Sequence, residues 1–533
     1  MSNTLISAAS KSVTQVDTPS SRCLFALGWA DITPPSGIYQ RMWGAARHDR
    51  ATGVHRPLRA TVALFAPIAA DEPVADDALS AISLSKASAL LQPSEGTAGG
   101  NAKRPPMPLQ MLLALDHCVL GAVEHEQLIA HIAEASGQPK ESILVVFSHT
   151  HAAGLMGLER VSLPGGDLIP GYLRSVAERS VELLKECVAR LAPANIVYGQ
   201  GWCDLAAHRD FFDQELKQFV CGFNPGAASD TTLVVARMTN DQGGLLATLV
   251  NYACHPTTLA WDNTLISPDF VGAMREVVEQ ATGAPCLFLQ GACGDLGPRE
   301  GFVGDTAVAD RHGRQLGFAA LSALVALPDA GTRFRYTGPV VSGATLGSWA
   351  HEPIAPCEAQ RSRRWDLWRW RERLQYRQGL PTTGEVEAAW QRLQSDEVSA
   401  RAAGDAPRAS EARAMAERKQ RLLHRLSQMP PGDAFPLQVV LWRLGDAFWL
   451  GVQGESYSLL QTELRRRFPG TPIVVASIAA DWGASYLPSA EVYGTGIYQE
   501  TIAVVAPGSL EQLITSVATR IAAAGGEPRP LGA

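Results

Sequence analysis

Two histidines separated by one residue are the first chemical feature of this sequence. Ser148-His149-Thr150-His151 directly follows the apolar run Ile143–Phe147, which has the length and composition of a buried strand. Side chains two residues apart on an extended chain point to the same side, so both imidazoles could face one metal ion. Hydrogen bonds at a strand end could equally hold such a pair, so the metal interpretation depends on ligands elsewhere in the chain.

Further candidate ligands follow apolar runs in the same way. His255 lies just after the run at 244–250, and Glu455 follows the run at 447–450. Zinc is commonly bound by His nitrogen and carboxylate oxygen, and a catalytic zinc ion keeps one position open for water. Two histidines and a glutamate would suffice, but their spacing in the sequence does not establish that they converge.

Six sequence blocks in a fixed order resemble the neutral ceramidase family. The resemblance runs from about Leu24 to about Ala524, interrupted by segments that have no match. Six separated blocks in the right order are far more specific than any single one. The blocks are Ala30-Asp31-Ile32-Thr33-Pro34-Pro35, Ser148-His149-Thr150-His151, Asn251-Tyr252-Ala253-Cys254-His255-Pro256-Thr257, Gly291-Ala292-Cys293-Gly294-Asp295, Gly454-Glu455, and Tyr486 with Tyr498.

The resemblance implies an amide hydrolase and a role for each of seven residues. These are His149, His255, Glu455 and Tyr486 as ligands of a zinc ion, His151 as a catalytic group beside it, and Arg209 and Tyr498 as groups that face the substrate.

Two blocks depart from the family pattern. Ala152-Ala153-Gly154 follows the histidine pair where the family has Ser-Gly-Pro, which alters the lining of the site. Residues 290–295 read Gln-Gly-Ala-Cys-Gly-Asp, so the serine given a role in some members has no counterpart. Zinc-activated water is then the simpler nucleophile.

The composition is that of a soluble globular protein. The 533 residues are 46% hydrophobic and 19% charged, and the formal net charge is −7. This length predicts two or three structural units, and the charge gives no reason to expect nucleic acid as a partner. The nine cysteines are scattered without a CxxC pair, which favours free thiols in a reducing compartment.

Several features predict a cytoplasmic protein. The first 21 residues lack the apolar segment of a signal peptide, and no run of about 18 apolar residues predicts membrane insertion. The chain ends about 35 residues after Tyr498, which leaves no room for the C-terminal β-sandwich domain of longer family members. We therefore expect a small, soluble amide or ester substrate rather than ceramide in a membrane.

The alternation of strand-like runs and amphipathic helices predicts an α/β fold, with a mixed sheet core covered by helices. We expect a disordered tail at 1–22, a surface insertion at 69–108, a catalytic core at 23–355, an inserted helical arm at 356–430, and a C-terminal part at 431–533 that completes the metal site.

The arm is predicted to contain three helices, at 358–378, 384–403 and 408–429. The first combines Trp365, Trp368 and Trp370 with several arginines. Such a helix could lie on a membrane surface or stack on nucleic acid, whereas the plainer alternative is that the tryptophans pack against the core or another subunit. An exposed arm would also suit a homo-oligomer.

These observations predict a zinc-dependent hydrolase of a linear amide bond. Ester or lactone hydrolysis would use the same groups. A cysteine hydrolase built on Cys293 or Cys254 would need a thiol of depressed pKa beside a base, which the sequence does not indicate. A non-catalytic binding protein of the same fold is the remaining alternative, and metal content distinguishes it.

Overall fold

The computed structural model describes residues 13–68 and 109–526. The predicted insertion at 69–108 and the first part of the predicted tail lie outside these residues. The prediction of disorder up to residue 22 extended too far, because β1 (Gln15–Asp17) and β2 (Ser20–Asp31) already belong to sheets. Ser20 pairs with Val197, and the hydroxyl of Ser21 lies 2.9 Å from that of Tyr198.

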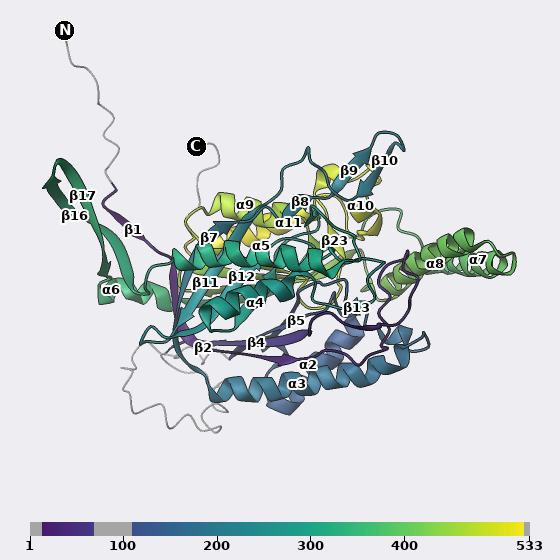
Figure 1. The fold of residues 1–533 in the computed structure, drawn as a ribbon, viewed down its shortest axis with the longest axis horizontal. Helices are drawn as coiled ribbons and strands as arrows, with labels where there is room; N and C mark the ends of the chain where they lie inside the picture. Colours follow the sequence, from purple (N-terminus) through teal and green to yellow (C-terminus); the bar gives the residue numbers. More distant parts are fainter. Residues whose placement is uncertain (1–12, 69–108, 527–533) are drawn as a thin grey trace, which may run out of the picture.

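A mixed sheet of eight strands forms the larger part of the core (Figure 1). Its outer pairs, β5 with β6 and β12 with β14, are parallel, and the pairs between them are antiparallel. In sheet order the strands are β14 (Cys286–Gln290), β12 (Leu245–Tyr252), β11 (Thr232–Thr239), β7 (Ala192–Trp202), β2, β4 (Arg59–Ala66), β5 (Gln110–Leu115) and β6 (Ile143–Phe147).

A second sheet of four strands packs on the first. Its order is β18 (Trp365–Gln375), β19 (Ala434–Leu444), β20 (Ala447–Val452) and β22 (Ile473–Ser477). The two sheets share one apolar cluster, in which Phe65 of β4 contacts Trp442 and Trp449 with ring centroids 6.0 and 5.3 Å apart. Successive strand residues point to opposite faces, so each sheet also has an outer face to cover.

Helices cover both outer faces, which gives four layers in the order helix, sheet, sheet, helix. The first sheet carries α2 (Ala122–Ser136) and α3 (Ile169–Ala189) over one half, and α4 (Phe270–Thr282) and α5 (Thr306–Val325) over the other. The second sheet is covered by α9 (Leu459–Arg467) and α11 (Ser509–Ala523). The predicted α/β class, with helices covering a mixed sheet, is confirmed.

The first predicted helix of the arm is wrong, because residues 365–375 form strand β18. It pairs along its whole length with β19, from Trp365↔Leu444 to Gln375↔Ala434. Trp365 packs on the cluster between the sheets, whereas Trp368 and Trp370 pack on the cluster beneath α11. This alternation has the period of a strand, and the tryptophans pack against the protein itself.

The other two helices of the arm are present as α7 (Thr383–Ala402) and α8 (Ala406–Ser427). Thr382 and Glu385 form a capping box at the start of α7, and the Asp405 side chain caps α8. The two helices form an antiparallel hairpin that projects from one side of the molecule, and the hairpin of β16 (Thr332–Ser342) and β17 (Ala344–Pro353) projects from the other (Figure 1). Among the described residues, no helix has the length and apolarity needed to span a membrane.

Candidate metal centre and substrate cavity

His149 begins the site, two residues after the end of β6. Its φ of 68° places it in the left-handed region, which is uncommon for a residue other than glycine and is found at strained functional positions. The backbone NH of His149 donates to the carbonyl of His117, and its Nδ1 lies 2.8 Å from the carbonyl oxygen of Cys118. Nδ1 therefore carries a proton and donates a hydrogen bond to this carbonyl, which leaves Nε2 free to act as a metal ligand.

His255 is held in the same way after β12. Its Nδ1 lies 2.8 Å from the carbonyl oxygen of Cys293, so Nε2 is again the free nitrogen. The Nε2 atoms of His149 and His255 face each other at 3.0 Å. Two lone pairs at this distance repel each other unless a proton or a cation lies near both.

Glu455 and Tyr486 come from the second half of the core. They pair directly in the short parallel strands β21 (Glu455–Ser456) and β23 (Tyr486–Leu487). The Oε2 atom of Glu455 lies 3.4 Å from Nε2 of His149 and 3.3 Å from Nε2 of His255. The hydroxyl of Tyr486 lies 3.4 Å from Nε2 of His255.

This donor set fits a zinc ion. The ligand atoms of His149, His255 and Glu455 all lie within 4.8 Å of one another. Glu455 Oε2 is buried without a hydrogen-bond partner, and a buried oxygen of this kind normally has one. Two imidazole nitrogens and one carboxylate oxygen are ligands that zinc commonly takes, with a position left for water or substrate.

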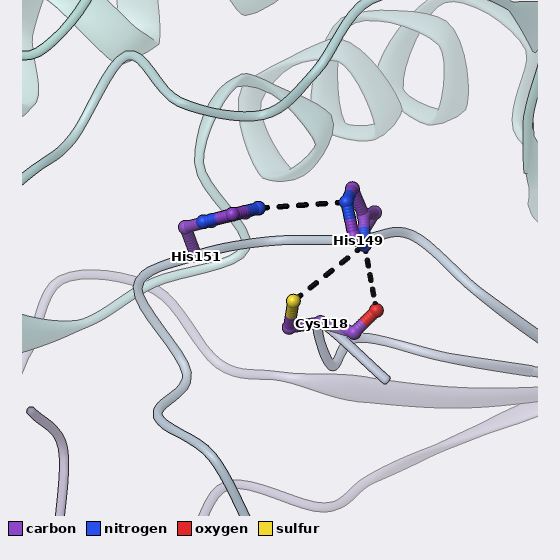
Figure 2. Close-up of side chains that lie close together, drawn as sticks. All are labelled: Cys118, His149 and His151. Atoms are coloured by element: carbon purple, nitrogen blue, oxygen red, sulfur yellow. Dashed lines mark hydrogen bonds between the residues drawn. The ribbon is translucent and has the colours of Figure 1, made fainter. Parts of the chain in front are cut away.

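A second trio, Cys118, His149 and His151, is less suited to one ion (Figure 2). Cys118 Sγ lies 3.6 Å from Nδ1 of His149, whereas Nε2 of His151 lies 3.5 Å from Nε2 of His149. The thiol and the second imidazole therefore face different nitrogens of the shared ring. Figure 2 shows a ring nitrogen of His151 directed at His149, on the other side of that ring from Cys118.

The other predicted residues lie around the centre. The ring of His151 packs in a tilted arrangement against that of Trp43, with centroids 5.3 Å apart. Buried Arg209 donates to the carbonyl of Gly294 and, over 3.0 Å, to the hydroxyl of Tyr486. The ring of Tyr498 lies 5.9 Å from that of Tyr486 and is 43% exposed, so its hydroxyl can meet a substrate.

The electrostatics leave the carboxylate ionised and two imidazoles neutral. Burial raises the pKa of Glu455, but His149 and His255 outweigh it and hold that pKa well below its usual value. Burial, then Arg209 and His149, lower the pKa of His255 to about 3. Burial and the other two histidines hold the pKa of His151 well below its usual value.

His149 balances the charge of Glu455 in the metal-free protein. Burial lowers its pKa, but Cys118 and Glu455 outweigh burial and hold the pKa well above its usual value. A proton on His149 therefore occupies the role that a cation would take, and a metal ion that binds here displaces it.

A cavity of about 430 Å³ opens onto this centre, within the size range of small-molecule sites. Its lining includes His149, His151, Glu455, Tyr486 and both predicted substrate-facing groups. The sequence analysis did not anticipate two further parts of the lining, the aromatic group Trp43, Trp261 and Phe302 and one face of α8. The three-to-four-residue spacing along α8 indicates one face of a helix, but it does not identify the part of the protein that this face packs against.

The two candidate nucleophilic thiols are not activated. Burial raises the pKa of Cys293 to about 11 and holds that of Cys254 well above its usual value. Neither thiol lines the cavity. Both are protonated at neutral pH, so neither Cys293 nor Cys254 is an activated nucleophile.

The layered fold is of the same class as that of neutral ceramidases. The neutral ceramidase from Pseudomonas aeruginosa superposes with a TM-score of 0.56 at 17% identity, over 97% of this chain and 76% of that one. A ceramidase complexed with C2 gives a TM-score of 0.57 at 17% identity, over 97% and 77%. No protein-family model and no curated protein matches the sequence. The resemblance expected from the six sequence blocks is thus confirmed in the fold.

Proposed function

We propose that the protein is a zinc-dependent hydrolase that cleaves a linear amide bond in a small N-acyl substrate. The convergence of two free imidazole nitrogens on a buried, unpartnered carboxylate oxygen carries the proposal. The shared fold supports it, since the superposed proteins are named as ceramidases.

His149, His255, Glu455 and Tyr486 would hold the ion. Zinc bound there supplies Lewis acidity and a water of lowered pKa. The carbonyl acceptors behind His149 and His255 fix both rings with Nε2 toward the centre, and such outer partners commonly set ligand orientation and affinity.

His151 is the proton-transfer group in this proposal. Its low pKa keeps the imidazole neutral, so Nε2 can accept a proton from the attacking water and return it to the leaving nitrogen. Arg209 and Tyr498 would donate hydrogen bonds to the carbonyl oxygen as negative charge develops on it, where one donor is worth about 3 kcal/mol.

The compartment and assembly are part of the same proposal. All nine cysteines are free, which suits the reducing cytoplasm. A homo-oligomer through the arm stays a prediction, as does a soluble substrate.

Metal analysis and a substrate panel test the proposal together. We expect one zinc ion per purified chain and hydrolysis of soluble N-acyl amines that stops with chelator and returns with zinc. Ester hydrolysis with no amide turnover would favour the esterase alternative. A protein that binds no zinc and turns over neither class would be a non-catalytic binding protein.

A further inference from the structure

One face of α8 forms a wall of the substrate cavity. The residues on it are spaced three or four apart, which places them on one side of a helix. They are Ala414, Glu417, Arg418, Arg421, Leu422 and Arg425. Three of the six are arginines, and the only acid among them is Glu417.

Contacts with the core fix the position of α8 relative to the cavity. Arg413 pairs with Asp49, and Glu417 lies 2.5 Å from Nε of buried Arg41. On the other side Arg418 donates to the hydroxyl of Thr501 over 2.9 Å. Contacts on both sides hold α8 against the mouth of the cavity. Glu417, the one acid of this face, is engaged in the ion pair with Arg41.

Arg425 is the buried cation of this face. Its side chain is 8% exposed, and its Nε has no hydrogen-bond partner. Nη1 donates to the carbonyl of Ile502 over 3.3 Å, and the guanidinium lies 5.1 Å from the Trp482 ring. No carboxylate of the described residues forms an ion pair with it, although a buried charge normally has a partner.

Another part of the cavity lining is apolar. Trp43 packs against Trp261 and Phe302 with ring centroids 6.1 and 5.6 Å apart, and against the candidate proton-transfer group His151. A substrate in this cavity would meet both these aromatic rings and the guanidinium groups of α8.

We propose that the cavity takes an amide bearing a carboxylate, an N-acyl amino acid, whose carboxylate pairs with Arg425 while its acyl chain lies against Trp43, Trp261 and Phe302. This rests on the function proposed above and specifies its substrate class. A guanidinium can bind a carboxylate through two parallel hydrogen bonds. The pairing would give the free Nε of Arg425 a partner and stabilise a charge that is otherwise buried alone.

Two substrates that differ in charge alone test the inference. N-octanoylglycine and its neutral counterpart N-octanoylglycinamide share the acyl chain and the scissile bond. For the zinc-loaded protein we expect kcat/KM to be about 10- to 150-fold higher for the acid, the range for a hydrogen-bonded charge. Arg425→Gln should bring the ratio close to one through a loss of kcat/KM on the acid.

Controls separate the anion site from general damage. Arg408→Gln, at an exposed position of the same helix, should keep the wild-type ratio, and Arg425→Lys should keep part of it. Equal rates on the two substrates in the wild type, or an equal loss on both in Arg425→Gln, would overturn the inference.

A binding measurement keeps the two proposals distinguishable. If neither substrate is hydrolysed, the proposed function fails, and calorimetric titration with N-octanoylglycine still tests the anion site. Binding to the wild type but not to Arg425→Gln supports the site, and absence of binding to both overturns it.

Discussion

His149 and His151 are two residues apart and have different surroundings. His149 has its Nδ1 committed to a backbone carbonyl and its Nε2 near another imidazole and a carboxylate. His151 lies beside that group and packs against Trp43. The geometry supports one metal ligand and one proton-transfer group within a single His-x-His pair.

His255→Ala should remove most of the zinc. The substitution deletes one of the two facing nitrogens and leaves a single imidazole beside Glu455 and Tyr486, whereas catalytic zinc sites typically have at least two His or Cys ligands. Elemental analysis of the purified variant measures this directly, with exposed His351→Ala as the matched control. Full zinc occupancy in His255→Ala would remove this residue from the ligand set.

His151→Ala should keep zinc and lose turnover by about 100- to 10,000-fold, the usual contribution of a general acid or base. His149→Ala should lose both metal and turnover. Zinc analysis combined with kcat on one N-acyl substrate separates the two roles. If the metal content of the two variants is the reverse, the assignments are reversed.

The strands that precede His149 and His255 could be predicted from the sequence, whereas the meeting of their ends could not. The runs at 143–147 and 244–250 predicted strands that end just before His149 and His255, and the structure has them as β6 and β12. The sequence could not show that those ends meet, because β5, β4, β2, β7 and β11 lie between them in the sheet. The sheet has to twist and curve to bring them together.

The wrong prediction of a helix where the structure has β18 has a similar physical reason. Arginine, glutamate and glutamine are good helix formers, and their abundance at 358–378 favoured a helix. Pairing with β19 and burial of Trp365 on one face and Trp368 on the other outweighed that local preference. The place of Arg425 in the cavity lining could not be predicted for the same reason. Helical spacing shows which residues share a face but not what that face packs against.

The helical part of the arm, α7 and α8 within residues 378–431, can be removed without interrupting the second sheet. β18 and β19 are antiparallel neighbours that end at the pair Gln375↔Ala434, so residues 378–431 occupy the place of a hairpin turn. We expect a chain in which Asn-Gly replaces 378–431, a favoured two-residue turn, to keep zinc, because no proposed ligand lies in the arm.

The same variant should lose the preference for the charged substrate and accept bulkier amides, since one wall of the cavity is gone. The kcat/KM ratio of N-octanoylglycine to N-octanoylglycinamide, compared with that of the full chain, measures the effect. An unchanged ratio would show that the arm does not control substrate choice.

At the scale of the whole molecule, the candidate centre joins the two sheets. His149 and His255 follow strands of the first sheet, and Glu455 follows β20 of the second. A ligand that binds only the folded protein stabilises it by about 2.7 kcal/mol at a hundred times its dissociation constant. Zinc should therefore raise the unfolding temperature of the chelator-treated protein, and scanning fluorimetry should show no such rise for His255→Ala.

A buried histidine away from the centre should contribute to acid sensitivity. His312 on α5 lies 3.1 Å from the hydroxyl of Thr258, and burial together with Arg311 lowers its pKa from 6.5 to about 4. The unfolded chain takes up this proton as the pH falls below about 6.5, but the folded protein does so only near 4. The stability that the neutral ring contributes above pH 6.5 is therefore lost progressively between these values.

His312→Gln should weaken the pH dependence of unfolding by about one proton in that window. Urea unfolding at pH 7, 6 and 5 measures this, with exposed His351→Gln as the control. An identical pH dependence in His312→Gln and the wild type would exclude the contribution.

The order of the site residues along the chain has a consequence for biosynthesis. His149 and His255 leave the ribosome first, whereas Glu455 and Tyr486 belong to the last part of the chain. A nascent chain that has grown only as far as the arm contains His149 and His255 but does not yet contain Glu455, whose carboxylate lies close to both. The centre can therefore close only after Glu455 and Tyr486 have been synthesised, so a product terminated before Glu455 cannot assemble it.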